Sequence, residues 1–414
     1  MIRKSNFILL FIGSISSMAL MAMSEPLGKI AQSSDSPAAE LEDLFLTFAQ
    51  EGTANDIQAL LDQGLHPNNT LKEMPKFWEA ISKRSENDKE NTLPIIRTLI
   101  NHAVKSLESE TISHDNTNKK VIINMDVNGT IIFGGSSGRR TPEQSAILAL
   151  VDDYRSKWDE TINEPISFSE YINVKFPGSS ADVQLKKKRD QAKFAFLTFL
   201  EETNHPLWEV AQKTYDKMVK QLELQQKSGN SVFNSFYKLI EYLEDNHINF
   251  SIILRSFGID TDNVAAEVNK NLKTNFFKNR NDFRGLLRLI DILPQEERLA
   301  HLQKIYNFIK TSENAGIRDD YNYWNSNSQH QPFSKPLLID NNDSSVIQIF
   351  FDDNVKSDPG SLINIVNPID AETGESLDVN ELIQNHMIVQ VNGVQALLDE
   401  NYFVNAVKNL LNNQ

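Results

Sequence analysis

The sequence predicts an α/β fold, in which a parallel sheet is flanked by helices. Three short apolar runs rich in β-branched residues are typical of buried strands in such a sheet, and they end near residues 126, 256 and 352. Segments of helical period lie between and after them. With 414 residues, the chain exceeds the usual size of a single core, so two or three domains are expected.

Residues 1–24 have the pattern of a signal peptide. Arg3 and Lys4 form a basic start, Phe7–Met21 is an apolar run, and residues 22–24 supply small side chains at the cleavage positions. A membrane anchor is the weaker interpretation, because the run falls short of about 18 to 20 apolar residues and is interrupted by Gly and Ser. We therefore expect an exported protein, periplasmic or secreted, with no membrane attachment after signal removal.

Composition excludes several classes of function. The formal net charge of −15 argues against nucleic-acid binding, which depends on Lys and Arg neutralising phosphates. A small phosphorylated substrate is still compatible, since a local cation can reverse the field within one cleft. The chain contains no cysteine, which excludes disulfides, thiolate catalysis and Cys-based zinc sites.

Residues 25–117 are expected to form a small helical module. Apolar residues return at helical spacing over Leu41–Ala49, and Glu51–Asn68 is similar to an ankyrin repeat, with a turn, a helix carrying a Leu pair, and a Gly and Pro-Asn ending. A weaker echo over Thr92–Ile100 follows at a lag of 39 residues (99 minus 60). Because so few repeats cannot bury a solenoid core alone, a plain helical bundle is the alternative. Such a module can bind a protein partner, and residues 109–119 form a plausible linker.

The run Val121–Phe133 places a carboxylate at the end of the first predicted strand. Asp126 follows the apolar residues and precedes a turn containing Asn128 and Gly129. Ligands of open α/β sheets bind at the carboxyl ends of the strands. An acidic side chain there can bind a metal ion or attack an electrophile. A strand that merely ends in a common turn composition is the alternative.

A helical insertion is expected over about 140–246. Thr141-Pro142 with Gln144 is a good helix start, and helical periodicity continues from there. The preceding loop, residues 134–138, satisfies the Gly-x-Ser-x-Gly pattern of serine hydrolases, but the nucleophile elbow requires a tight turn directly between strand and helix. Lys186–Arg189 can bind a phosphorylated substrate, although a solvated helix face is the commoner explanation.

Two later strands also end in polar side chains. Phe250–Gly258 carries Ser256 at its end, and Val346–Asn354 ends in Asp352 and Asp353. A cation, Lys335, comes shortly before the last of these strands.

Further segments are expected to complete and cover the sheet. Helices are expected over 260–272, 296–310 and 395–411, and strands over 362–366 and 387–391.

The order of these polar groups resembles the haloacid dehalogenase-like (HAD-like) hydrolase superfamily. The resemblance covers residues 118–414 and is carried by an Asp, a Ser, a Lys and an Asp pair: Asp126, Ser256, Lys335, Asp352 and Asp353. It implies a Rossmannoid parallel sheet with a helical cap inserted after the first core strand. In such enzymes the cap closes over the cleft.

The resemblance also implies a magnesium-dependent phosphohydrolase acting on a small phosphorylated substrate. Asp126 would attack phosphorus and become an aspartyl phosphate, and Mg²⁺ would be held by Asp126, the backbone carbonyl of Asn128, and Asp352 or Asp353. Carboxylate and carbonyl oxygens suit this ion.

The other implied catalytic residues are Ser256, Lys335 and Asn128. Ser256 would hydrogen-bond the phosphoryl oxygens, and Lys335 would offset negative charge. Asn128 departs from the family, in which a second Asp usually protonates the leaving group and activates water. The loss of general acid–base help, about 10² to 10⁴-fold, predicts slow turnover. A catalytically inactive scaffold or effector that binds a protein partner is the alternative.

Overall fold

The computed structural model describes most of the chain after the expected signal peptide. The described residues are 37–62, 65, 74–108, 119–134, 140–178, 182–356 and 364–412. The signal peptide, nearly all of the expected linker and most of the 134–138 loop lie outside them. The chain divides into two compact units, Met1–Glu110 with Arg284–Lys304, and Thr111–Phe283 with Ile305–Gln414. Within the described ranges, no helix combines the length and apolar character needed to cross a bilayer.

The described part of the first unit is all helical, which confirms an all-α N-terminal region. Helix α4 packs on α7, and both α5 and α16 pack on α8. Its core is aromatic in part: the rings of Phe45 and Phe77 meet edge to face at 5.8 Å. The elements are α4 (Pro37–Gln50), α5 (Ala54–Asp62), α7 (Met74–Asn87), α8 (Lys89–Glu108), α16 (Leu286–Ile292) and the beginning of α17 (Gln295–Thr311). The weaker repeat echo therefore falls inside α8, whereas much of the turn expected before residue 68 lies outside the described residues.

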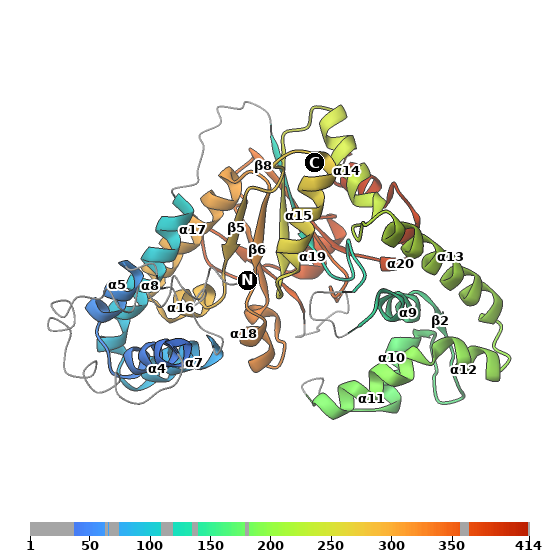
Figure 1. The fold of residues 1–414 in the computed structure, drawn as a ribbon, viewed down its shortest axis with the longest axis horizontal. Coiled ribbons are helices and arrows are strands. Elements are labelled where there is room, and N and C mark those ends of the chain that lie inside the picture. Colours follow the sequence, from blue (N-terminus) through green and yellow to red (C-terminus); the bar gives the residue numbers. More distant parts are fainter. Residues whose placement is uncertain are drawn as a thin grey trace. The chain divides into compact units, whose positions relative to one another are not determined.

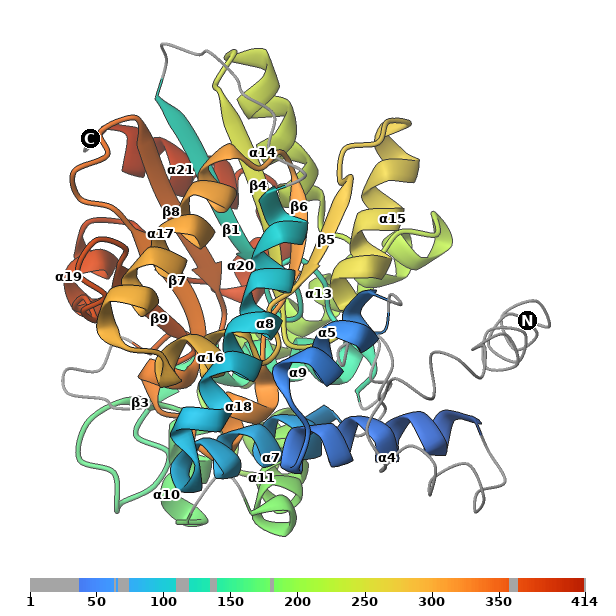
Figure 2. The ribbon, with the colours of Figure 1, turned by 90° about the vertical axis from the view of Figure 1, so that its left-hand side faces the viewer.

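The second unit is built on a six-stranded sheet in which every pair is parallel, as the sequence predicts (Figures 1 and 2). The strand order is β10-β8-β1-β4-β6-β5. The strands are β1 (Lys120–Asp126), β4 (Phe250–Ser256), β5 (Asn279–Asp282), β6 (Ala315–Arg318), β8 (Val346–Asp352) and β10 (Ile388–Gln390). The three longest of them are those whose apolar runs are evident in the sequence.

Apolar residues of β1 and its neighbours bind one layer of helices to the sheet. Val121, Ile123 and Met125 share a buried core with Phe236, Val264 and Phe403, from three of the helices. The four helices of this layer are α14 (Asn234–Asp245), α15 (Asp260–Leu272), α20 (Gly393–Leu398) and α21 (Tyr402–Asn412). The single helix expected over 395–411 is in fact two, because Asp399 adopts an extended conformation between them.

The other face of the sheet carries a small second sheet. Strands β7 (Lys335–Ile339) and β9 (Val366–Asp370) pair in parallel with each other and with no strand of the large sheet. The expectation that a strand near 362–366 completes the main sheet is therefore wrong. Leu337 and Val366 instead pack on Phe350, with help from α19 (Val379–Gln384).

The chain between β1 and β4 is mainly helical, as expected. Helix α9 begins with the predicted cap: Gln144 N donates to Thr141 Oγ1 at 3.2 Å, and Thr141 N donates to the Gln144 side chain at 3.0 Å. The elements before α14 are α9 (Pro142–Asp153), β2 (Arg155–Ser156), β3 (Ile166–Ser167), α10 (Phe168–Lys175), α11 (Val183–Phe194), α12 (Phe196–Glu202) and α13 (Trp208–Lys227).

The basic run in α11 is partly occupied by local contacts. The Arg189 guanidinium donates to the carbonyls of Phe176 and Gly178, and the Lys188 ammonium lies 4.5 Å from the Phe176 ring centroid. These contacts favour a structural role for this end of the run.

Candidate metal centre and active site

Three adjacent parallel strands deliver polar side chains to one edge of the sheet. Asp126, Ser256 and Asp352 are the last residues of β1, β4 and β8. Met125 lies opposite Leu254 on one side and Phe351 on the other, so the three strands end at nearly the same level. This edge is where open α/β sheets bind ligands.

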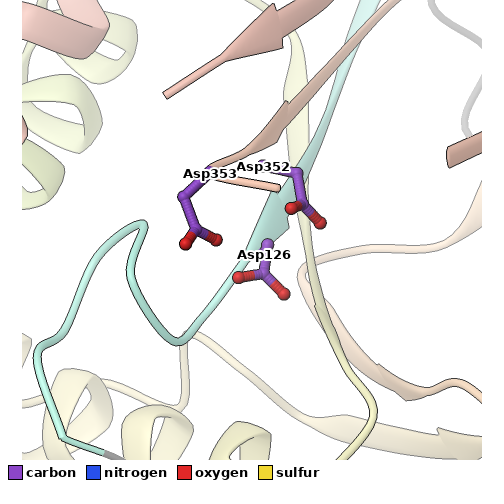
Figure 3. A group of neighbouring side chains, drawn as sticks. All are labelled: Asp126, Asp352 and Asp353. Carbon is purple, nitrogen blue, oxygen red and sulfur yellow. The ribbon is translucent and has the colours of Figure 1, made fainter. Parts of the chain in front are cut away.

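Asp126, Asp352 and Asp353, here called the acidic cluster, converge at this edge (Figure 3). Each offers a carboxylate oxygen, and these three oxygens lie within 4.8 Å of one another. Asp126 and Asp352 are buried, at 6% and 0% exposed. Three convergent carboxylates are suitable ligands for a divalent cation.

Lys335 lies against the acidic cluster and is itself buried. Its Nζ donates to Asp126 Oδ1 and, at 2.7 Å, to Asp352 Oδ2. Burial alone would lower the pKa of Lys335, but the negative charges of Asp126 and Asp352 outweigh that effect and hold the pKa above its ordinary value. The side chain is therefore a permanent ammonium ion at neutral pH.

The carboxylates are not fully neutralised by this one ammonium. Burial, followed by the charge of Asp352, raises the pKa of Asp126 to about 7, although Lys335 opposes the rise. Burial and the charges of Asp352 and Asp126 also hold the pKa of Asp353 well above its usual value. A buried group of three carboxylates with one counter-ion favours uptake of protons or of a metal cation. The donor set thus fits a hard divalent ion.

The turn after β1 closes tightly on the acidic cluster. Gly129 has φ +90°, and a Cβ atom built on it would lie 2.4 Å from Asp353 Oδ2. Gly129 N donates to Ile132 O at 2.9 Å, and Ile131 N donates to Val127 O at 3.0 Å. The backbone conformation therefore favours glycine here, and any larger residue would displace the Asp353 carboxylate.

The same turn positions Asn128 and Thr130. Asn128 is exposed just beyond the buried end of β1. Thr130, which is fully buried, donates from Oγ1 to Asp126 Oδ2 at 3.4 Å. Thr130 was not among the site residues expected from the sequence, although its spacing of four from Asp126 is visible there.

Ser256 lies one strand away from Asp126 at the same edge. Its side chain is buried, and its Oγ accepts a hydrogen bond from Gly258 N at 3.0 Å. The hydroxyl hydrogen can still be donated, so the group can contact a ligand at this edge.

An aromatic group that is not among the site residues expected from the sequence lies beside Lys335. The Phe257 ring centroid is 5.1 Å from Lys335 Nζ, and the ring stacks on Trp324 at 5.4 Å with Tyr321 at its edge. Trp324 and Tyr321 belong to helix α18 (Tyr321–Ser326). The three aromatic rings form an apolar surface on one side of the Lys335 ammonium.

Comparison of the chain with protein-family models, with curated proteins and with solved structures finds no match. The chain is therefore characterised by its Rossmann-like α/β fold and by the buried acidic cluster at the edge of its sheet.

Proposed function

We propose that the chain is a magnesium-dependent phosphohydrolase that acts through an aspartyl-phosphate intermediate, as the resemblance to HAD-like hydrolases implies. One observation carries the proposal: a buried lysine, Lys335, bridges the last residues of two adjacent strands, Asp126 and Asp352. Phosphoryl transfer through a covalent intermediate needs a nucleophilic carboxylate, a counter-ion and metal ligands, and this cluster brings together residues suited to each role.

The proposed metal ligands are Asp126, Asp352 or Asp353, and the backbone carbonyl of Asn128. When bound, Mg²⁺ supplies positive charge against the phosphoryl oxygens. The acidic cluster is under-neutralised without it, which supports this assignment over a simple ion pair.

In the proposed reaction, an oxygen of Asp126 forms a bond to phosphorus while the bond from phosphorus to the leaving group breaks. Lys335 offsets the charge that gathers on Asp126 and the phosphoryl group, and the Ser256 hydroxyl donates to a phosphoryl oxygen. Water then hydrolyses the aspartyl phosphate, releasing phosphate and regenerating the carboxylate.

Asn128 limits the rate in this scheme. Its amide cannot protonate a leaving oxygen or take a proton from water, and general acid–base help of this kind contributes about 10² to 10⁴-fold. Substrates whose leaving group needs no proton, such as acyl phosphates and aryl phosphates, are therefore favoured over alkyl phosphates. We place the substrate among small phosphorylated molecules rather than nucleic acids, and the protein among exported ones.

The test uses the mature chain with 4-nitrophenyl phosphate and acetyl phosphate, in Mg²⁺ and in EDTA. Activity that requires Mg²⁺ and is abolished by Asp126→Asn is the expected result, and Asn128→Asp should raise turnover of the aryl phosphate about 10-fold or more. Asp343→Asn serves as the matched control. It removes a carboxylate that pairs with Lys310 at 2.5 Å and precedes β8, at the opposite end of that strand from the acidic cluster.

The alternative is an inactive scaffold that binds a protein partner through its N-terminal helices or its helical insertion. The amide at Asn128 is the observation that favours it. Metal binding without turnover of either phosphate, in the native chain and in Asn128→Asp alike, would establish this alternative and refute the phosphohydrolase.

A further inference from the structure

Lys335 is carried by a strand that does not belong to the central sheet. Strand β7 pairs only with β9 among the described strands, whereas Asp126 and Asp352 end strands of the central sheet. No backbone ladder therefore sets the position of Lys335 relative to the carboxylates that it contacts. Other groups must fix β7 at that place.

Polar side chains on the face of the central sheet contact the β7 backbone. Arg255, on β4, donates from Nη1 to the carbonyl of Pro336 at 2.9 Å. Gln348, on β8, donates from Nε2 to the carbonyl of Leu338 at 2.6 Å. The residue that follows Lys335 is thus held directly by a side chain of the strand that carries Ser256.

Arg255 is in turn oriented by a buried counter-ion. Its Nη2 and Nε contact Asp319 Oδ1 and Oδ2 at 2.5 and 3.0 Å, and its Nη1 also reaches Asn124 Oδ1 at 3.3 Å. The two charged side chains are 0% and 2% exposed. Asp319 is anchored as well, because its backbone N donates to Ser256 O at 2.8 Å.

Burying a bidentate ion pair this deeply costs desolvation free energy. Desolvation of two charges often exceeds their attraction, and apolar residues of similar volume can be as stabilising. The planar guanidinium, however, offers several donors in fixed directions, which apolar side chains cannot do. Here those donors join β4, β1, β7 and the segment after β6 at a single point.

We infer that Arg255 is a positioning residue for the active site: with Asp319 as its counter-ion, it fixes β7 so that the Lys335 ammonium stays between Asp126 and Asp352. The inference rests on the proposed function, in which Lys335 is an active-site group. Displacing such a group by about 1 Å can cost on the order of 10²-fold in rate.

The test is a double-mutant cycle between Arg255→Met and Lys335→Met, with Arg255→Lys and Asp319→Asn as milder variants and Asp343→Asn as the control. Arg255→Met should lower kcat about 10-fold to 10²-fold with little change in KM, and it should have no further effect in the Lys335→Met background. Arg255→Lys should lose less, because it keeps the charge but not the fork. Asp343→Asn should leave kcat unchanged.

Two readouts make the inference independent of turnover. In Mn²⁺ titrations, Arg255→Met should change the affinity for Mn²⁺ when it is introduced into the native chain. The same substitution introduced into Lys335→Met should leave the affinity for Mn²⁺ unchanged. A crystal structure of Asp319→Asn or Arg255→Lys should show Lys335 withdrawn from at least one carboxylate. If Arg255→Met does not fold, these two milder variants carry the test.

Additive losses in the cycle, or a variant structure in which Lys335 keeps both carboxylate contacts, would overturn the inference. If the native chain neither binds Mn²⁺ nor hydrolyses phosphates, the proposed function fails, and the variant structures alone then decide whether Arg255 positions Lys335.

Discussion

The substitution Lys335→Met tests how strongly the acidic cluster depends on its buried ammonium. Methionine has a similar length but no charge, so Asp126 and Asp352 each lose the contact to Nζ. Both carboxylates are buried. Removing one partner of a buried ion pair costs about 3–5 kcal/mol, because the remaining charge is left uncompensated. We expect a loss of unfolding free energy of this size at pH 8 in EDTA.

A divalent cation should recover much of this loss. An ion that binds only the folded state stabilises it by about 2.7 kcal/mol when its concentration is about a hundredfold above Kd. Without the Lys335 charge, the acidic cluster should also bind the ion more tightly. The stabilisation by Mg²⁺ should therefore be larger in Lys335→Met than in the native chain.

Calorimetric unfolding of both proteins, in EDTA and in Mg²⁺, measures the two effects. Asp343→Asn is again the control, since its loss of stability should be the same with and without Mg²⁺. Equal destabilisation of Lys335→Met under the two conditions would refute the idea that ammonium and metal share one cluster of carboxylates. An unchanged stability in EDTA would refute the assignment of Lys335 as its buried counter-ion.

Two further predictions concern the turn and the titration of the acidic cluster. Gly129→Ala should lower the unfolding free energy by about 1–3 kcal/mol. It should also weaken Mn²⁺ binding, measured by titration, because the new Cβ would meet Asp353. The control is Gly229→Ala, at φ +73° with open space around it, which should lose stability through backbone strain but keep its affinity for Mn²⁺. The pKa of Asp126 is raised to about 7 in the folded, metal-free chain. Between about pH 4 and 7 the folded chain therefore binds more protons than the unfolded chain. The contribution of Asp126 to stability consequently falls as the pH rises through that window. Mn²⁺ must displace that proton, so its affinity should rise as the pH rises from 5 towards 7. A pH-independent affinity in titrations from pH 5 to 9 would contradict this.

The parts of the fold that the sequence reveals are those with long apolar runs. Strands β1, β4 and β8 are buried over nearly their whole length, so their residues are almost continuously apolar and their polar endings stand out. Strand β5 is four residues long and polar in composition, Asn279–Asp282, and it joins the sheet through its backbone pairing with β6. Such a strand leaves no hydrophobic pattern to detect.

The same contrast applies to the candidate site. Asp126 and the Asp352–Asp353 pair follow strong strand signals, whereas the Arg255–Asp319 pair joins residues 64 positions apart, and Asp319 follows a strand of only four residues. The small β7–β9 sheet was missed for a related reason. The strand expected over 362–366 looks like a member of the main sheet, and β7 was not expected as a strand at all. Only side-chain contacts such as Arg255 to Pro336 O show that the pair lies on the face of that sheet.

The pairing of β1 with β4 has a consequence for how the insertion can vary. These strands are adjacent in the sheet, yet residues 127–249 separate them in the chain. The free-energy cost of closing so long a loop, which comes from lost chain entropy, grows only slowly with loop length, by about 0.6 kcal/mol for each doubling. A change in the length of this connection therefore costs little chain entropy, provided that the turn at Gly129, the register of the two strands and the buried residues of α14 that pack on the sheet are kept.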